Sequence, residues 1–159
     1  MRPISEIGIR RGGGFTLVEI LVVVAITGVV FAVAAVNLWP SNEEVARREA
    51  GLLAMSLEQA RDAAWFGGRP TAVSFEPGRL HRWQLAADRT WRADPALDRR
   101  LAGVGIGSLY VDGQEMPPGQ RLVFLADGFG VPFRLQLEIR GIARAIEGDA
   151  AGAITVVEK

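Results

Sequence analysis

The sequence predicts an α+β fold, in which a long N-terminal helix packs on a domain of antiparallel strands. An apolar run from Phe15 to Trp39 is followed by apolar residues spaced three and four apart, as on one face of a helix. In contrast, glycine and proline divide residues 67–159 into short runs typical of strands and turns. At 159 residues, the chain fits one modest domain plus an anchor.

The composition excludes several kinds of site. Lysine and arginine total 18, as do aspartate and glutamate, whereas a nucleic-acid-binding domain normally carries a basic excess. The lack of cysteine excludes disulfides, thiol catalysis and thiolate metal sites, and the single histidine, His81, excludes a multi-histidine metal site. From this composition we expect no metal site and no nucleic-acid partner, and because the sequence contains no motif for them we also expect no catalytic residue and no cofactor.

A short polar leader, residues 1–14, precedes the apolar run and contains Arg10 and Arg11. The run, Phe15–Trp39, is long enough to cross the bilayer core as a helix. Because positive charge before the first apolar segment keeps that end in the cytoplasm, the rest of the chain is expected on the other side. The prediction from this charge pattern is a single-pass membrane protein whose C-terminal domain lies outside the inner membrane.

Glu19 lies inside this run, where an ionised carboxylate costs roughly 2.5 to 3.5 kcal/mol and usually has a partner. A secretory signal peptide would be cleaved near the small residues Ala32-Val33-Ala34. However, the apolar segment of such a peptide is about 7 to 15 residues long and uncharged. A plain signal anchor would explain the length of the run but not Glu19.

Gly14 followed by Phe15-Thr16-Leu17-Val18-Glu19 and an apolar helix resembles the class III signal of type IV pilins and type II secretion pseudopilins. The resemblance implies a pilin-like α+β fold. It also implies that a prepilin peptidase cuts between Gly14 and Phe15, N-methylates Phe15 and leaves the helix in the mature protein. Glu19 would then be the family's glutamate at the fifth mature position.

Cleavage would create an ammonium group at Phe15, which is largely charged at neutral pH. Glu19 follows four residues later, one helical turn away, at the positive end of the helix dipole. Pairing with this terminus, or with the terminus of a neighbouring subunit, would offset the cost of the carboxylate in lipid. Glu19 is therefore predicted to set the register of packed helices, with the choice of terminus left open.

Beyond the run, Pro40 predicts a break in the helix, and Ser41 is the expected N-cap where the helix resumes. Gly67-Gly68 should end this second, amphipathic helix. Its core-facing residues are expected to be Ala46, Ala50, Leu53, Leu57, Ala60 and Ala64. The predicted order of parts is a leader at 1–14, a membrane and assembly helix at 15–39, an amphipathic helix at 40–66 and a periplasmic β-rich domain at 67–159.

Seven strands are expected, of which 133–139 is the best defined because apolar and polar residues alternate strictly. Residues 86–102 are interpreted as a surface excursion, and His81 as a surface or edge-strand residue. The glycines of 103–107 lack the spacing of a phosphate-binding loop and are interpreted as strand or loop glycines. Trp65, Trp83 and Trp91 are interpreted as packing residues, with a role as interface anchors, above all for the loop around Trp91, as the alternative. The seven strands are 71–75, 80–85, 104–111, 121–125, 133–139, 142–146 and 153–157.

Residues 122–137 resemble the C-terminal part of the H-type minor pseudopilins of type II secretion (general secretion pathway protein H, GspH). The end of the chain, 154–159, lacks the acidic calcium loop usual in major pseudopilins. The resemblance implies a structural subunit near the tip of the periplasmic pseudopilus, which helps export folded proteins through the outer-membrane secretin. The partners it implies are other minor and major pseudopilins, prepilin peptidase, the inner-membrane assembly platform and exported cargo.

Two alternatives stay open from the sequence. A type IV pilus minor pilin of the FimT kind would bind DNA through basic C-terminal residues, but Arg140, Arg144 and Lys159 are few for that purpose. A membrane-anchored periplasmic enzyme would need a nucleophile beside a base, and the sequence contains no recognisable motif of this kind. The favoured interpretation is that the protein is not an enzyme.

Overall fold

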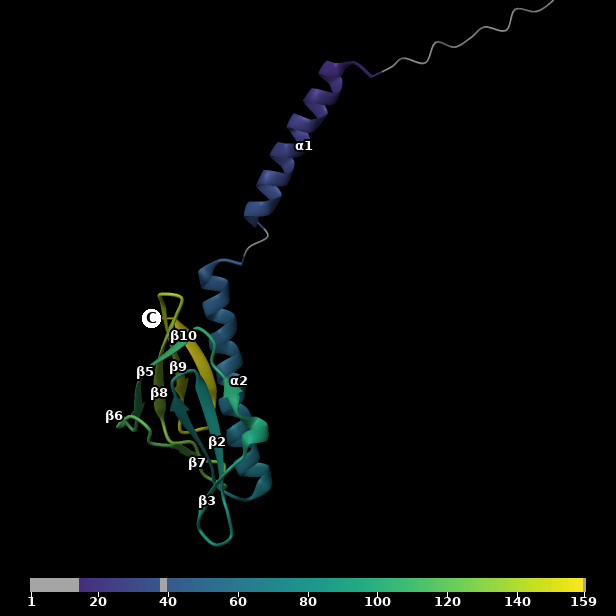
Figure 1. Ribbon diagram of the computed structural model, residues 1–159. Helices are drawn as coiled ribbons and strands as arrows, with labels where there is room; N and C mark the ends of the chain where they lie inside the picture. Colours follow the sequence, from purple (N-terminus) through teal and green to yellow (C-terminus); the bar gives the residue numbers. More distant parts are fainter. Residues whose placement is uncertain (1–14, 38–39, 159) are drawn as a thin grey trace, which may run out of the picture. The chain divides into compact units, whose positions relative to one another are not determined.

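The computed structural model describes residues 15–37 and 40–158. These residues form two α-helices, one short 3-10 helix (Pro95–Leu97) and ten strands, and the chain (Figure 1) divides into two compact units immediately after Trp39. We refer to them as unit 1 and unit 2 in chain order. The predictions for residues 1–14, among them the leader and the cut after Gly14, lie outside the described residues.

Unit 1 contains helix α1 (Leu17–Asn37), which begins two residues later than the apolar run. Thr16 explains this start, because its hydroxyl and carbonyl oxygens both accept the backbone N–H of Glu19, at 3.2 and 3.0 Å. This is the arrangement of a helix N-cap. The side chains described along the helix are exposed, and Leu17–Ala35 has the length and composition of a membrane span.

Unit 2 begins with helix α2 (Asn42–Gly67), which resumes after Pro40 as the sequence predicts. The Ser41 hydroxyl accepts the backbone N–H of Glu44 at 3.1 Å, and the Glu44 carboxylate accepts the backbone N–H of Ser41 at 3.0 Å. This capping box satisfies two donors that the first turn leaves unpaired. At the other end, Gly68 has a φ of 60°, which suits glycine and terminates the helix.

Replacing Ser41 by alanine is expected to lower the free energy of unfolding of unit 2 by about 1 kcal/mol, because the cap is lost. Chemical denaturation of a fragment that starts at Pro40 measures the change. Ser41→Asp is the matched control, since aspartate also caps helices and should retain the stability. Equal stability of Ser41→Ala and the wild type would show that the cap contributes nothing.

Two antiparallel sheets complete unit 2. The first has the strand order β3-β2-β1-β7 with β4 also paired to β2, and the second has the order β10-β9-β8-β5-β6. Helix α2 contacts β1 and β7 of the first sheet and β8, β9 and β10 of the second (Figure 1). The α+β prediction is confirmed, although the strands form two sheets rather than one. The strands are β1 (Thr71–Glu76), β2 (Arg79–Leu85), β3 (Trp91–Ala93), β4 (Arg99–Arg100), β5 (Val104–Val111), β6 (Gln114–Glu115), β7 (Leu122–Phe124), β8 (Phe133–Ile139), β9 (Ile142–Gly148) and β10 (Ile154–Glu158).

The core of unit 2 lies between α2 and the two sheets. On β8, the alternation in the sequence becomes an alternation in burial, so that every second side chain from Phe133 to Ile139 is buried. The rings of Phe124 on β7 and Phe133 on β8 meet edge to face, with their centroids 6.3 Å apart, and so join the two sheets. All six residues predicted for the core face of α2 are buried, and Ala54 joins them: Ala46, Ala50, Leu53, Ala54, Leu57, Ala60 and Ala64.

The prediction that residues 86–102 are a surface excursion is wrong in part. Both β3 and β4 pair with β2, and Leu101 is buried. Strands of two or three residues are too short to show a period of two, so the pattern does not reveal them. Asp88, in the turn before β3, accepts hydrogen bonds from the hydroxyl and backbone N–H of Thr90. Led by the hydroxyl contact, these hydrogen bonds lower the pKa of the exposed Asp88 carboxyl.

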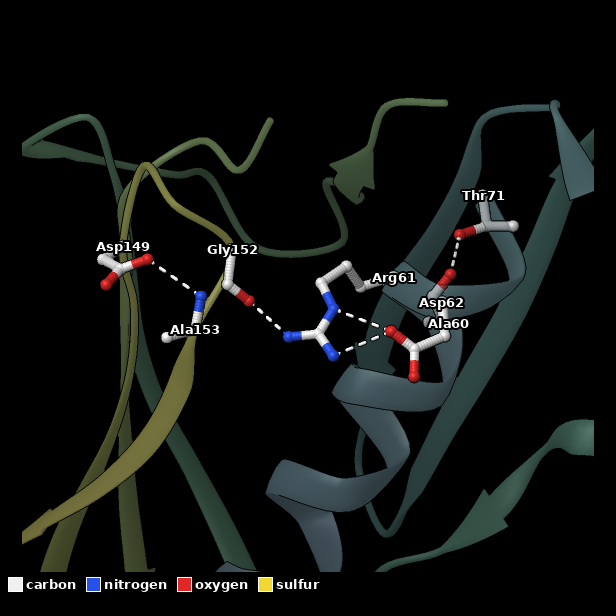
Figure 2. A network of polar contacts seen from close by, with 7 residues as sticks. All are labelled: Ala60, Arg61, Asp62, Thr71, Asp149, Gly152 and Ala153. Carbon is white, nitrogen blue, oxygen red and sulfur yellow. Dashed lines mark hydrogen bonds and ion pairs between the residues drawn. The ribbon is translucent and has the colours of Figure 1, made fainter. Parts of the chain in front are cut away.

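Hydrogen bonds connect the last turns of α2 to both sheets (Figure 2). The Thr71 hydroxyl at the start of β1 donates to the Ala60 carbonyl oxygen at 2.5 Å. The Arg61 guanidinium pairs with Asp62 at 2.7 Å and donates to the carbonyl oxygen of Gly152, in the β9–β10 turn. This end of the helix is therefore tied to one strand of the first sheet and one turn of the second.

Candidate assembly site

The candidate assembly site consists of Phe15, Thr16 and Glu19 at the N-terminal end of α1. Phe15 is 74% exposed and precedes the helix, Thr16 caps it, and Glu19 lies in its first turn. Phe15 and Glu19 are thus four residues apart, and Phe15 lies before the first helical residue, Leu17. The Glu19 side chain is exposed beside the positive end of the helix dipole.

The Glu19 carboxylate takes part in none of the ion pairs found among the described residues. Helix α1 itself contains no lysine, arginine or histidine. The side chains of α1 thus offer Glu19 no cation, and the predicted partners are the ammonium group that processing would create at Phe15 or that of another subunit. The roles of Gly14, Phe15 and Glu19 stay predictions.

Small residues follow one face of α1, a feature that the sequence analysis missed. Ala25, Gly28, Ala32 and Ala35 are spaced three, four and three residues apart. A methyl group added at Gly28 would meet nothing within 4 Å, so unit 1 gives no internal reason for this glycine. Small residues at such spacing are typical of membrane helices that pack closely, and the spacing alone could have revealed them.

Three aromatic side chains are exposed at the far end of α2 from Pro40 and on the nearby β7–β8 connection. Trp65, Phe66 and Phe129 are 55%, 83% and 72% exposed, and the rings of Trp65 and Phe66 stack with centroids 5.7 Å apart. A Cβ added at Gly128 would lie 3.1 Å from the Trp65 ring, so the β7–β8 connection packs against part of the Trp65 indole. Trp65 is therefore largely exposed, which favours the interface alternative over the preferred packing role for this residue.

His81 lies on β2, which is paired on both sides, so the edge-strand interpretation is wrong. Its Nδ1 lies 2.8 Å from a carboxylate oxygen of Asp98, and its Nε2 lies 3.3 Å from a carboxylate oxygen of Glu76. The neighbouring Ser74 hydroxyl instead accepts the indole N–H of Trp83 at 2.9 Å. The side chain of His81 thus faces two carboxylates and makes no hydrogen bond to a nucleophile in the described chain.

Arg121 and Arg144 of unit 2 both contact side chains of the same unit. The guanidinium carbon of Arg121 lies 4.1 Å from the ring centroid of Trp83 and 5.9 Å from that of Trp91, as in a cation–π contact. Both rings are half-buried, which agrees with their predicted packing role. Arg144 is 6% exposed and pairs with Glu43 at the start of α2, so it is not a surface contact for DNA.

The described residues hold no group of three or more histidine, cysteine, aspartate or glutamate side chains placed to bind a metal ion. The chemistry visible in residues 15–37 and 40–158 is that of ion pairs, caps and packing.

Two protein-family models match the sequence. The prokaryotic N-terminal methylation motif matches residues 9–35, which include the predicted cut and all of the candidate assembly site. The type II transport protein GspH family matches residues 49–154, which cover most of α2 and both sheets. A search of curated proteins gave no match.

Solved structures share the fold. Two structures of the minor pseudopilin EpsH from the type II secretion system of Vibrio cholerae match with 22% identity. One match has a TM-score of 0.54 and covers 71% of this chain and 96% of the solved chain. The other has a TM-score of 0.50 and covers 69% and 97%. Since the GspH family model spans more than half of the sequence, the chain belongs to the type II transport protein GspH family, and the EpsH structures share its fold.

Proposed function

We propose that prepilin peptidase cuts the chain between Gly14 and Phe15 and methylates the new amino group of Phe15. Glu19 then pairs with this ammonium group or with that of a neighbouring subunit, and the pair fixes the register of α1 against the next helix. The observation that carries this proposal is the exposed Glu19 carboxylate in an apolar helix without any cation. The match of residues 9–35 to the N-terminal methylation motif supports it independently.

The same motif supports a division of the chain into a leader at 1–14 and a membrane and assembly helix at 15–39. We infer that the amphipathic helix at 40–66 and the β-rich domain at 67–159 lie in the periplasm, because Arg10 and Arg11 keep the other end in the cytoplasm. In this arrangement the chain remains anchored in the inner membrane until the assembly platform moves it into the pseudopilus.

Within the pseudopilus, we place the chain near the tip, among other minor pseudopilins and above the major ones. Its β-rich domain contacts neighbouring subunits and exported cargo, and it helps to push folded proteins through the outer-membrane secretin. The domain acts through surface contacts and not through catalysis. The exposed aromatic residues Trp65, Phe66 and Phe129 support a role in contacts, because large exposed aromatic side chains are typical of protein interfaces.

Replacing Gly14 by leucine is expected to leave the leader attached, because the peptidase needs a small residue at the cut. Mass spectrometry of the chain isolated from membranes measures the retained residues 1–14. Gly12→Leu is the matched control, since it changes the same glycine-rich segment two residues from the cut and should be processed normally. A Gly14→Leu chain with the same mature N-terminus as the wild type would contradict the proposed cleavage site.

A further inference from the structure

Strand β5 leaves a long edge unpaired. On one side it pairs with β8, with a register shift between Ile106 and Leu109, whereas on the other β6 pairs only with Tyr110 and Val111. A backbone hydrogen bond from Met116 to Leu109 ends this contact, and no described strand pairs with that side of residues 104–108. Alternate residues of an antiparallel strand direct their N–H and C=O groups away from a given neighbour. The 104–108 edge therefore presents backbone donors and acceptors.

This edge lines a groove of about 660 Å³. The opposite walls are the β1–β2 turn at Glu76-Pro77-Gly78 and the connection from β6 to β7 at 116–120. Phe75, Ile106 and Met116 line the groove, are half-buried and pack on the core of unit 2. The groove thus combines an apolar floor with a strand edge, and its volume falls within the range usual for binding sites.

Two glycines leave this edge without shielding side chains. Gly105 and Gly107 are exposed, so no side chain at either position shields the strand. A Cβ at Gly107 would lie 3.1 Å from the Cβ of Gln136 on β8, so glycine also lets the two strands approach. Glycine within a strand often marks a place where another backbone comes close.

The charges lining the groove are all negative. Glu76 and Glu115 are its only lining residues with a formal charge, and both lie at exposed positions. The Glu115 carboxylate accepts the Ser108 hydroxyl at 2.5 Å, which holds it beside the strand edge. A segment that enters the groove would therefore be favoured by a basic side chain.

We propose that this groove binds an extended segment of a neighbouring pseudopilin, which adds to β5 as a further strand and places a basic side chain near Glu76 and Glu115. An extended segment uses the free backbone groups of an edge, whereas a helix has already satisfied its own. At roughly 3.3 Å per residue, the 104–108 edge spans about 17 Å and suits about five residues. The inference rests on the proposed function, which supplies the partner.

The other outer strand of the same sheet does not offer an equivalent site. Strand β10 lines no part of this groove, and neither does β7 at the outer side of the first sheet. Among the described strands, β5 thus combines an unpaired stretch with a groove that can hold a sixth strand beside it.

Hydrogen–deuterium exchange on the processed full chain in membrane vesicles tests the proposal, with and without the other pseudopilins of its secretion system co-expressed. On co-assembly, amides of 104–108 are expected to exchange at least about tenfold more slowly, while those of β10 stay unchanged. Co-assembly without slower exchange at 104–108 overturns the strand addition and leaves the proposed function intact. Protection that appears only with exported cargo also overturns it, and failure to co-assemble at all contradicts both.

A double variant, E76K/E115K, tests the role of the two glutamates that line the groove. It should reduce the yield of co-assembled chain roughly tenfold and abolish the slower exchange at 104–108, because like charges would then face the incoming segment. Glu58→Lys is the matched control, since Glu58 lies on α2, outside the groove, and forms none of the ion pairs described above. Equal thermal midpoints show that the variants are folded. Normal co-assembly and protection in E76K/E115K overturn the proposal.

Discussion

Replacing Glu19 by valine is expected to leave membrane insertion intact but to reduce co-assembly with partner pseudopilins by roughly 100-fold. Valine makes the apolar run more hydrophobic, so insertion itself is favoured. However, the ammonium group of the processed terminus then has no carboxylate partner. An unpaired charge in lipid costs roughly 2.5 to 3.5 kcal/mol, which corresponds to about two orders of magnitude in an equilibrium constant. Cross-linking between this chain and co-expressed pseudopilins measures the loss.

Glu19→Gln separates the role of the charge from that of the helix cap. Glutamine retains the size of the side chain, and the backbone N–H of residue 19 can still donate to the Thr16 hydroxyl. If Glu19 acts through its charge, Glu19→Gln should lose co-assembly as severely as Glu19→Val. Normal co-assembly of Glu19→Gln would instead assign Glu19 to the local geometry of the helix start, and the register role would be wrong.

Replacing Leu57 by alanine is expected to lower the free energy of unfolding of unit 2 by about 2 to 5 kcal/mol. Leu57 is fully buried on the face of α2 that packs on the sheets, so the substitution removes buried methyl groups and leaves a cavity. Chemical denaturation of the fragment from Pro40 measures this change, because unit 2 is a compact unit by itself.

Met55→Ala is the control for this effect. Met55 lies two residues earlier on the same helix and is 54% exposed, so its truncation removes little buried surface. We expect a change within about 0.5 kcal/mol, as is usual for surface substitutions. Equal losses for the two variants would mean that the buried face of α2 does not stabilise unit 2 in the way described here.

The elements with a strong local pattern could be predicted from the sequence. The stripe on α2 and the alternation on β8 each reflect one buried face, and Ser41 and Gly68 act through their immediate neighbours. Strands β3, β4 and β6 are two or three residues long and carry no periodicity. The division into two sheets depends on pairings between distant segments, such as β1 with β7, which a local pattern does not contain.

The assembly site at Glu19 and the groove beside β5 also differ in whether the sequence reveals them. Glu19 stands out in the sequence because one carboxylate in an apolar run is costly wherever the helix packs. The groove beside β5 could not be predicted, because it exists only where β6 stops and the β1–β2 turn stands opposite. The prediction that the glycines of 103–107 are strand or loop glycines is confirmed, since Gly105 and Gly107 lie in β5, but the free edge beside them depends on the fold.

The mature N-terminus tests the central claim most directly. Mass spectrometry and N-terminal sequencing of the chain purified from the inner membrane should find Phe15 as the first residue, carrying one added methyl group on its amine. A native chain that begins at Met1, or one that begins after Ala34, would leave Glu19 without the amine that is proposed to balance it. Either result would contradict the assembly mechanism.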